Sequence, residues 1–239
     1  LGALLTGCSG SKSRLFKPLT APEAKMVKSY KKIYGKKTDA YRVLIATDYG
    51  NMVVRLYNET PLHRANFVEK VTSGFYDSLL FHRVIKNFMI QGGDPNSKYA
   101  PAGTALGMGS APNQARVPAE IRTDLNFYHK KGVLAAAGDG NPEKASSNCQ
   151  FYLAQGQVFR PAELDSNAKQ RGFTLSDIQK QLYTTVGGIP HLDGAYTVFG
   201  ELEEGLPVLD SLAKVPTAPG NRPKTDLRMR MFVVGKAKR

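Results

Sequence analysis

The clearest pattern of hydrophobic and polar positions along the chain is a two-residue period that begins at Tyr41. Side chains from 41 to 47 alternate between two faces, as in a β-strand with one face buried. The next four residues, 48–51, read Asp-Tyr-Gly-Asn and are typical of a tight turn, and 52–57 is again apolar. The sequence therefore predicts a β-hairpin over residues 41–57.

A helical pattern precedes this hairpin. Thr20 and Glu23 have the spacing of a capping box, with a proline between them, and Gly35 is a suitable end. The apolar side chains of one face are Val27, Tyr30 and Tyr34, and lysines cover the rest. We expect a helix that packs on the main domain, stands off a membrane or serves only as a spacer.

A second helix is predicted from Thr60-Pro61 to Gly74. Beyond it, glycine, proline, asparagine and aspartate separate several short apolar segments. These segments are 81–89, 133–137, 151–153, 197–199 and 228–234. Many short strands with few helices predict a mainly β fold, either a closed antiparallel barrel or a sandwich.

The pattern changes between residues 157 and 188. Segments 161–170 and 174–183 look helical, and Thr174 with Asp177 forms a possible capping pair at the start of the second. We interpret 157–188 as a helical insertion in a β domain, because the apolar β pattern resumes after it.

Composition and charge add less to the prediction than the pattern of hydrophobic and polar positions does. The 239 residues are 41% hydrophobic and 22% charged, which fits an ordinary globular protein with one main domain, expected to be a monomer. The net charge of +13 would suit an anionic membrane surface or polyanion, but the basic residues are spread along the chain. A solvated basic surface is therefore favoured, and no nucleic-acid partner is expected.

The first nine residues are apolar and small, and they end in Leu5-Thr6-Gly7-Cys8-Ser9. This run is too short to cross a bilayer. Leu5 to Cys8 resembles the bacterial lipobox, which implies lipid attachment at Cys8 and a membrane partner in the bacterial cell envelope, facing the periplasm. A chance match is the alternative. The other cysteine, Cys149, lies in a different context, so no disulfide framework is predicted.

The most informative stretch is Phe81–Asp94, which places one arginine and one glutamine among aromatic and aliphatic residues. On a strand, Phe81, Arg83 and Ile85 would share one face, and Met89 and Gln91 would share another. A buried Arg83 would need a partner, so a structural salt bridge and a binding site are both open interpretations. Gly92-Gly93 would allow close approach of a ligand to the backbone.

Three motifs in this region and beyond it occur in a characteristic order. They are F-H-R-V-I-x-x-F-M-x-Q-G-G-D at 81–94, G-V-L-A-A-A-G-D at 132–139 followed by A-S-S-N-C-Q-F-Y at 145–152, and L-D-G-x-x-x-V-F-G at 192–200. Together with Pro61 and Asn66-Phe67, they closely resemble the cyclophilin-type peptidyl-prolyl isomerases. The resemblance covers about Tyr41 to the C-terminus, apart from the insertion.

The resemblance implies a closed eight-stranded antiparallel barrel capped by two helices, with the substrate groove outside. It divides the chain into a signal remnant and tether (1–19), an N-terminal helical segment (20–40) and an isomerase domain (41–239). Arg83 matches the catalytic arginine. The positions that match substrate-binding residues are Phe88, Met89, Gln91, Ala137, Gly138, Asp139, Gln150, Tyr152, Leu192 and Tyr196. No cofactor or metal is implied, and the partners would be proline-containing polypeptides.

Isomerisation makes and breaks no bond to the substrate, so a fixed cation and an apolar pocket would suffice. The function implied is peptidyl-prolyl isomerisation that assists the folding of exported proteins, and the alternative is a binding or chaperone module without catalysis. Three residues depart from the family pattern: His191 replaces a common aromatic residue, Tyr196 a histidine and Cys149 a serine. Strand alternation gives His82 a structural role facing away from the groove.

Overall fold

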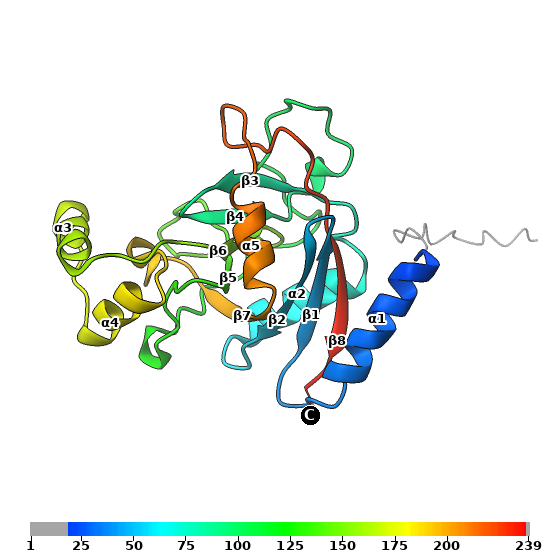
Figure 1. The fold of residues 1–239 in the computed structure, drawn as a ribbon, viewed down its shortest axis with the longest axis horizontal. Coiled ribbons are helices and arrows are strands. Elements are labelled where there is room, and N and C mark those ends of the chain that lie inside the picture. Colours follow the sequence, from blue (N-terminus) through cyan, green and yellow to red (C-terminus); the bar gives the residue numbers. More distant parts are fainter. Residues whose placement is uncertain (1–18, 238–239) are drawn as a thin grey trace, which may run out of the picture.

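The computed structural model describes residues 19–237, and its centre is an antiparallel sheet of eight strands (Figure 1). The strands are β1 (Arg42–Thr47), β2 (Gly50–Leu56), β3 (Phe81–Ile85), β4 (Met89–Gly92), β5 (Val133–Ala136), β6 (Phe151–Ala154), β7 (Val198–Glu204) and β8 (Arg230–Gly235). They are hydrogen-bonded in the order β3-β4-β6-β5-β7-β2-β1-β8. The predicted hairpin is confirmed as β1 and β2, in which Thr47 pairs with Gly50.

The prediction of a closed barrel needs correction, because the ladder of paired strands has two ends, β3 and β8. The edges approach each other just before β8 begins, through an isolated bridge between Leu80 and Arg228. Backbone hydrogen bonds of 2.9–3.0 Å from Phe81 to Leu227 and from Ser78 to Met229 support this contact. β8 begins only at Arg230, and the chain before it makes only this isolated bridge, so the ladder between β3 and β8 stays incomplete. The result is a strongly curled, open sheet.

Both faces of the central strands are buried. Along β5, Leu134 and Ala136 point into the core of the curled sheet, whereas Val133 and Ala135 pack in a second cluster on its outer face. This explains the continuous apolar run in the sequence. Two helices close the main core: α2 (Pro61–Thr72) and α5 (Leu206–Leu212).

The helix α1 (Ala21–Tyr34) begins at the predicted cap, where the Thr20 hydroxyl accepts a hydrogen bond from the Glu23 amide. It packs on the sheet beside β8, and Val27 and Tyr34 share a cluster with Leu44 and Val234. Of the alternatives for this segment, the structure therefore has the helix packed on the main domain. The predicted lipobox and Cys8 lie outside the described residues.

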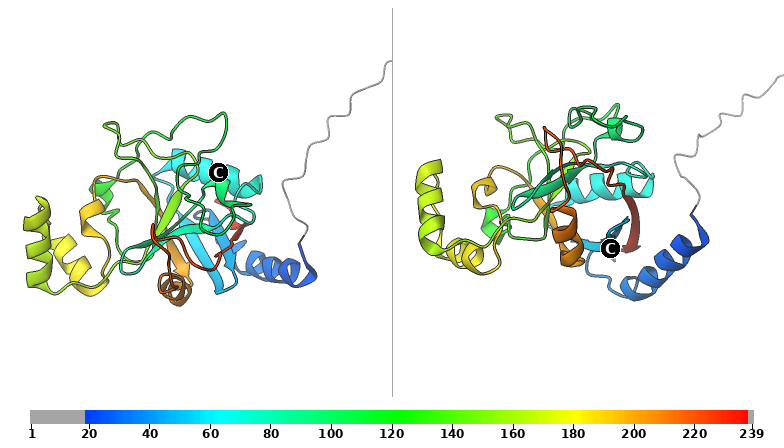
Figure 2. Two further views of the ribbon diagram at one scale, coloured as in Figure 1. Left: turned by 90° about the horizontal axis from the view of Figure 1, so that it is seen from above. Right: turned by 45° about the horizontal axis from the view of Figure 1, so that its top comes forward.

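The insertion contains α3 (Pro161–Arg171) and α4 (Asp177–Thr185) and projects from the side of the sheet opposite α1 (Figures 1 and 2). The predicted cap at Thr174 is wrong by two residues: the Ser176 hydroxyl accepts from the Gln179 amide, and the Gln179 side chain accepts from the Ser176 amide. Ser176 has the extended backbone that an N-cap requires.

The insertion has a narrow base. Gln157 and Gly188 exchange two backbone hydrogen bonds of 3.0 and 3.3 Å where the chain enters and leaves. A small core packs Phe159, Leu164 and Tyr183 of the insertion against Tyr128 of the main domain. Short 3-10 turns complete the fold at Pro95–Ser97, Thr123–Leu125 and Pro190–Leu192. None of the helices in residues 19–237 is long and apolar enough to cross a membrane.

Candidate active site

Nine of the eleven predicted catalytic and substrate-binding residues line one small hollow of about 90 Å³ on the outer face of the sheet. They are Arg83, Phe88, Met89, Gln91, Ala137, Gly138, Tyr152, Leu192 and Tyr196, and this set is called the Arg83 hollow below. The residues come from β3, β4, β6, the segment after β5 and the segment before β7. The fold thus brings together three motifs that are spread over more than a hundred residues of the sequence.

A β-bulge directs Arg83 to this face. The pairing of β3 with β4 shifts register between Phe81 and Arg83, so that Phe81 packs in the main core. The expectation that Phe81, Arg83 and Ile85 share a face is therefore wrong for Phe81, because a bulge interrupts the alternation that it assumed.

Arg83 has an amide partner in place of a carboxylate. Its Nη1 donates to Oε1 of Gln91 at 3.2 Å, and no described carboxylate lies within 4.0 Å of the guanidinium. Its charged carbon also lies 5.9 Å from the centre of the Phe88 ring. A guanidinium has five donors, and only one is engaged in a hydrogen bond here, so donors remain for a group in the hollow. This excludes the structural salt bridge as the reason for Arg83.

A chain of hydrogen bonds fixes the Gln91 amide. Since its Oε1 accepts from Arg83, its Nε2 donates to Oε1 of Gln150 at 3.0 Å. Gln150 in turn donates to the carbonyls of Gly107 and Gly109 at 2.9 and 2.8 Å. Gln150 is therefore adjacent to the hollow and orients Gln91.

Gly92 at the end of β4 and Gly93 just after it serve internal packing. A Cβ on Gly93 would lie 2.2 Å from the carbonyl oxygen of Cys149, and its φ of +95° also favours glycine. The close approach predicted for a ligand is thus made by the segment that carries Gln150.

The apolar wall of the hollow contains stacked rings. Phe88 stacks on His191 with centroids 5.7 Å apart and planes inclined by 11°, and Tyr152 meets the edge of Tyr196 at 6.2 Å. Burial, followed by the nearby charge of Arg171, lowers the pKa of His191, so this ring is neutral at pH 7. The two departures from the family pattern at His191 and Tyr196 therefore still supply rings.

A polar network that the sequence did not predict lies behind Tyr152. The Tyr152 hydroxyl is 2.9 Å from Nε2 of His129, and Nδ1 of His129 is 3.0 Å from the Asp193 carboxylate. Because a carboxylate only accepts, Nδ1 donates to it, and Nε2 faces the tyrosine hydroxyl, which can donate or accept. Asp193 also accepts from Tyr183 at 2.6 Å and Gln179 at 2.7 Å, both on α4. The insertion is thereby connected to the floor of the hollow.

One predicted substrate-binding residue lies apart from this arrangement. Asp139 is exposed and accepts hydrogen bonds from Asn141 and Arg116, which lower the pKa of its carboxyl. It belongs to the loop beside the groove and does not line the Arg83 hollow. A contact to substrate from Asp139 remains a prediction.

His82 and Cys149 are both buried away from the hollow. No described residue makes a hydrogen bond to either ring nitrogen of His82, which is 2% exposed. Burial raises the pKa of the Cys149 thiol, as expected of a small buried side chain in place of a reactive one. His82 does not line the Arg83 hollow.

The hollow thus combines a permanent cation, an oriented amide and an apolar cavity large enough for a small ring. It contains no nucleophile paired with a base, since Cys149 is buried and the His129 ring is engaged by Tyr152 and Asp193. Such a set can orient an apolar ring and stabilise an electron pair beside it.

These features define the class of protein. The family model of cyclophilin-type peptidyl-prolyl cis-trans isomerases matches residues 42–234. The chain belongs to this family.

Relatives agree with this assignment. A Staphylococcus aureus protein, provisionally described as a peptidyl-prolyl cis-trans isomerase, is 33% identical over 187 residues, which cover 78% of this chain and 87% of the relative. The peptidyl-prolyl cis-trans isomerase-like 2 of Rhizopus delemar is 34% identical over 208 residues, which cover 85% of this chain. The chain spans only 30% of that relative and 37% of a bifunctional phosphatase/isomerase homologue from Streptococcus pyogenes.

Solved structures show the same fold. A cyclophilin-type isomerase from Cryptosporidium parvum superposes with a TM-score of 0.59 at 24% identity, over 81% of this chain and 97% of that one. A second structure of that protein, determined in the presence of the dipeptide Ala-Pro, gives a TM-score of 0.58 over 80% of this chain and 98% of that one.

Proposed function

We propose that this isomerase accelerates the rotation of X-Pro bonds in exported polypeptides, and so assists their folding at the bacterial envelope. The observation that supports the catalytic role best is Arg83 itself: a guanidinium with no carboxylate partner among residues 19–237, directed to an apolar hollow that fits a pyrrolidine ring. The Ala-Pro dipeptide of the Cryptosporidium parvum structure supports proline as the bound residue.

The chemistry follows from the barrier. Rotation about an X-Pro bond breaks amide resonance and costs about 18–20 kcal/mol. In the twisted transition state the prolyl nitrogen becomes pyramidal and regains a lone pair. A donor of Arg83 stabilises that lone pair more than it stabilises the planar amide, and this difference lowers the barrier.

The neighbouring residues confine the rotation. Phe88, Met89, Tyr152 and Leu192 would hold the proline ring, and Gln91 would hold the adjoining peptide through its remaining donor. With one half of the substrate fixed, only the other half turns.

A rate measurement tests the proposal against a binding module without catalysis. The full chain is added to a proline peptide, and cis/trans exchange is followed by exchange NMR, because the uncatalysed step takes tens to hundreds of seconds. Exchange should become much faster at catalytic concentrations of protein. If the peptide binds but its exchange rate is unchanged, the binding alternative is correct.

Membrane attachment is a separate part of the proposal, supported by the lipobox-like Leu5–Cys8. Diacylglyceryl modification at Cys8 would give at least two acyl chains, which anchor a protein stably. Expressed with its complete signal, the wild type should fractionate with membranes and carry an acyl mass increment. The Cys8→Ser variant should lose both, and identical fractionation of the two forms would exclude the anchor.

A further inference from the structure

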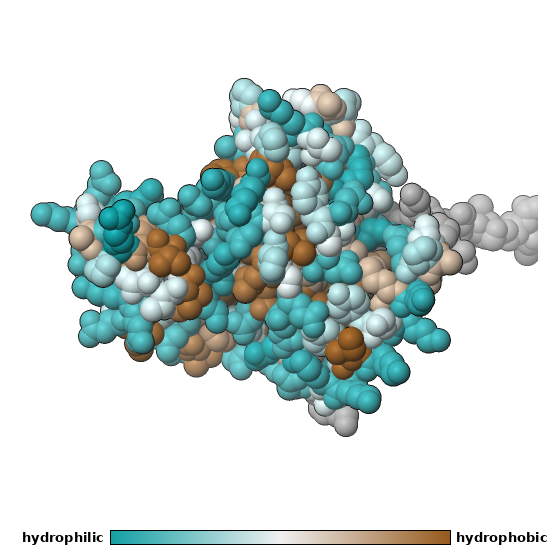
Figure 3. All heavy atoms as spheres, in the orientation of Figure 1, coloured by the Kyte–Doolittle hydropathy of each residue, from teal (hydrophilic) through white to brown (hydrophobic). Residues whose placement is uncertain are grey.

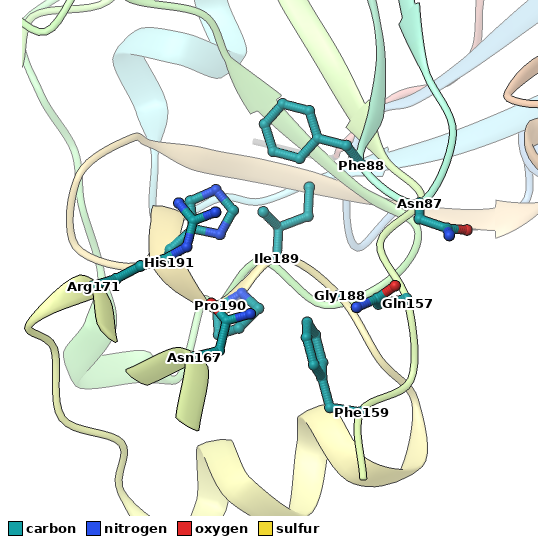
Figure 4. A pocket seen from close by; sticks show the side chains of 10 residues that line it. All are labelled: Asn87, Phe88, Gln157, Phe159, Asn167, Arg171, Gly188, Ile189, Pro190 and His191. Carbon is teal, nitrogen blue, oxygen red and sulfur yellow. The ribbon is translucent and has the colours of Figure 1, made fainter. Parts of the chain in front are cut away.

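A larger hollow adjoins the Arg83 hollow, and the insertion supplies much of its lining (Figure 4). Its volume is about 320 Å³. We call this cavity the insertion hollow. It is lined by Asn87, Phe88, Gln157, Phe159, Asn167, Arg171, Gly188, Ile189, Pro190 and His191. Phe88 lines both hollows, so they are adjacent at this ring.

Several of these residues are held rigidly. Phe159 is buried against the small core of the insertion, and its amide donates to the carbonyl of Tyr183 at 3.0 Å. The Gln157–Gly188 pair fixes another side, and the Phe88–His191 stack forms the boundary with the Arg83 hollow. These contacts preorganise the cavity.

The chemistry of the lining is asymmetric. Phe88, Phe159, Ile189 and Pro190 are apolar, three of the polar residues are neutral amides, and Arg171 carries the only fixed charge. Arg171 reaches from the end of α3 toward His191 (Figure 4), and no described carboxylate forms an ion pair with it. The acidic residues nearby have other partners: Glu163 pairs with Arg160 and Asp165 with Lys180.

The position of this hollow along a bound peptide follows from β4. The Phe88 carbonyl accepts hydrogen bonds from Gln155 and Gly156, just before the insertion. Gln91 lies three residues further on, about 10 Å away along the strand. Gln91 and Gln150 match the family positions that bind the substrate backbone or the residue before proline. The insertion hollow lies at the opposite end, where the residues after proline would pass.

The surrounding surface suits a polypeptide. The insertion exposes three large hydrophobic side chains, Val158, Ile178 and Val186. Figure 3 shows hydrophobic side chains gathered on the insertion, at the left of the view, amid otherwise mostly hydrophilic surface. An extended chain that left the proline position would meet apolar surface beside one cation.

We propose that the insertion hollow is a subsite for the two residues that follow proline in the substrate, and that Arg171 gives it a preference for an acidic side chain there. This inference rests on the proposed isomerase function. It assigns the insertion a role in substrate selection, with a carboxylate of the client as the partner of Arg171.

Matched peptides test the preference on the full chain. The specificity constant kcat/KM is measured for Ala-Ala-Pro-Glu-Phe and Ala-Ala-Pro-Phe-Glu, and each is compared with its glutamine counterpart, all amidated. A partly exposed ion pair should favour the better glutamate peptide about two- to fivefold at low salt. When the glutamate precedes proline, as in Ala-Glu-Pro-Phe-Gln, kcat/KM should equal that of its glutamine counterpart.

Two variants separate this site from general attraction to a basic protein. Arg171→Gln should bring the glutamate-to-glutamine ratio close to one. Lys169→Gln removes an equal charge from the same last turn of α3, outside the hollow, and should leave the ratio unchanged. An equal fall in both variants, or a ratio that persists in Arg171→Gln, would overturn the subsite.

The outcomes also separate this inference from the function on which it rests. If the wild type accelerates the neutral peptides but shows no preference after proline, only the subsite is wrong. If it accelerates no peptide, the isomerase proposal itself fails.

Discussion

Replacing Arg83 with alanine is expected to lower kcat/KM for a proline peptide by about 10²–10³, the usual loss when one preorganised donor to a transition state is removed. The loss should fall mainly on kcat, because the prolyl nitrogen offers its lone pair only in the twisted state. The apolar hollow remains in the variant, so peptide binding should change much less. Exchange NMR measures turnover, and titration with the same peptide measures affinity.

Two further variants sharpen this experiment. Arg83→Lys keeps the charge but loses the planar fork, and it should recover only part of the activity. Lys86→Ala removes a charge from the exposed turn after β3 and should behave like the wild type. Unchanged turnover in Arg83→Ala, with a folded protein by circular dichroism, would remove Arg83 from the mechanism.

The second large effect concerns the stability of the fold at acid pH. Burial lowers the pKa of His82 to about 4, below its ordinary value of 6.5. Between these two values the unfolded chain binds a proton that the folded chain does not bind. The free energy of unfolding therefore falls as the pH drops from about 6.5 to about 4, by about 3 kcal/mol from this residue.

Urea denaturation at a series of pH values measures this slope. His82→Leu removes the titrating group at similar volume, and neither ring nitrogen has a described hydrogen-bond partner to lose. The variant should therefore lose less stability than the wild type between pH 6.5 and 4. Other groups titrate in both proteins, so the difference between the two curves isolates His82. Parallel curves would show that the ring is already protonated or hydrated in the folded state.

Local patterns in the sequence predicted much of the fold. Alternation and turn residues were sufficient for the β1–β2 hairpin, and the Thr20 cap was placed correctly because both partners lie within one turn of helix. Three motifs were sufficient to predict Arg83 and eight residues that share its hollow, although their roles in catalysis remain predictions.

The features that the sequence did not predict depend on contacts across the fold. Whether the sheet closes depends on how far the segment before β8 can pair with β3, and no local pattern specifies that. The His129–Asp193 pair joins residues 64 positions apart, and each looks ordinary in the sequence. Arg171 is one of many dispersed cations until the fold places it beside Phe88 and His191.

The base of the insertion has a consequence for how this protein could have diversified. Because Gln157 and Gly188 are directly paired, the chain segments that enter and leave the insertion already lie close enough to be joined by a short turn. A gene could gain or lose the intervening segment in a single event while the sheet kept its register. Without the insertion, Asp193 would lose its hydrogen bonds from Gln179 and Tyr183 and keep those from His129. Tyr128 would lose its packing against Phe159, Leu164 and Tyr183. Client choice could thus evolve separately from the chemistry.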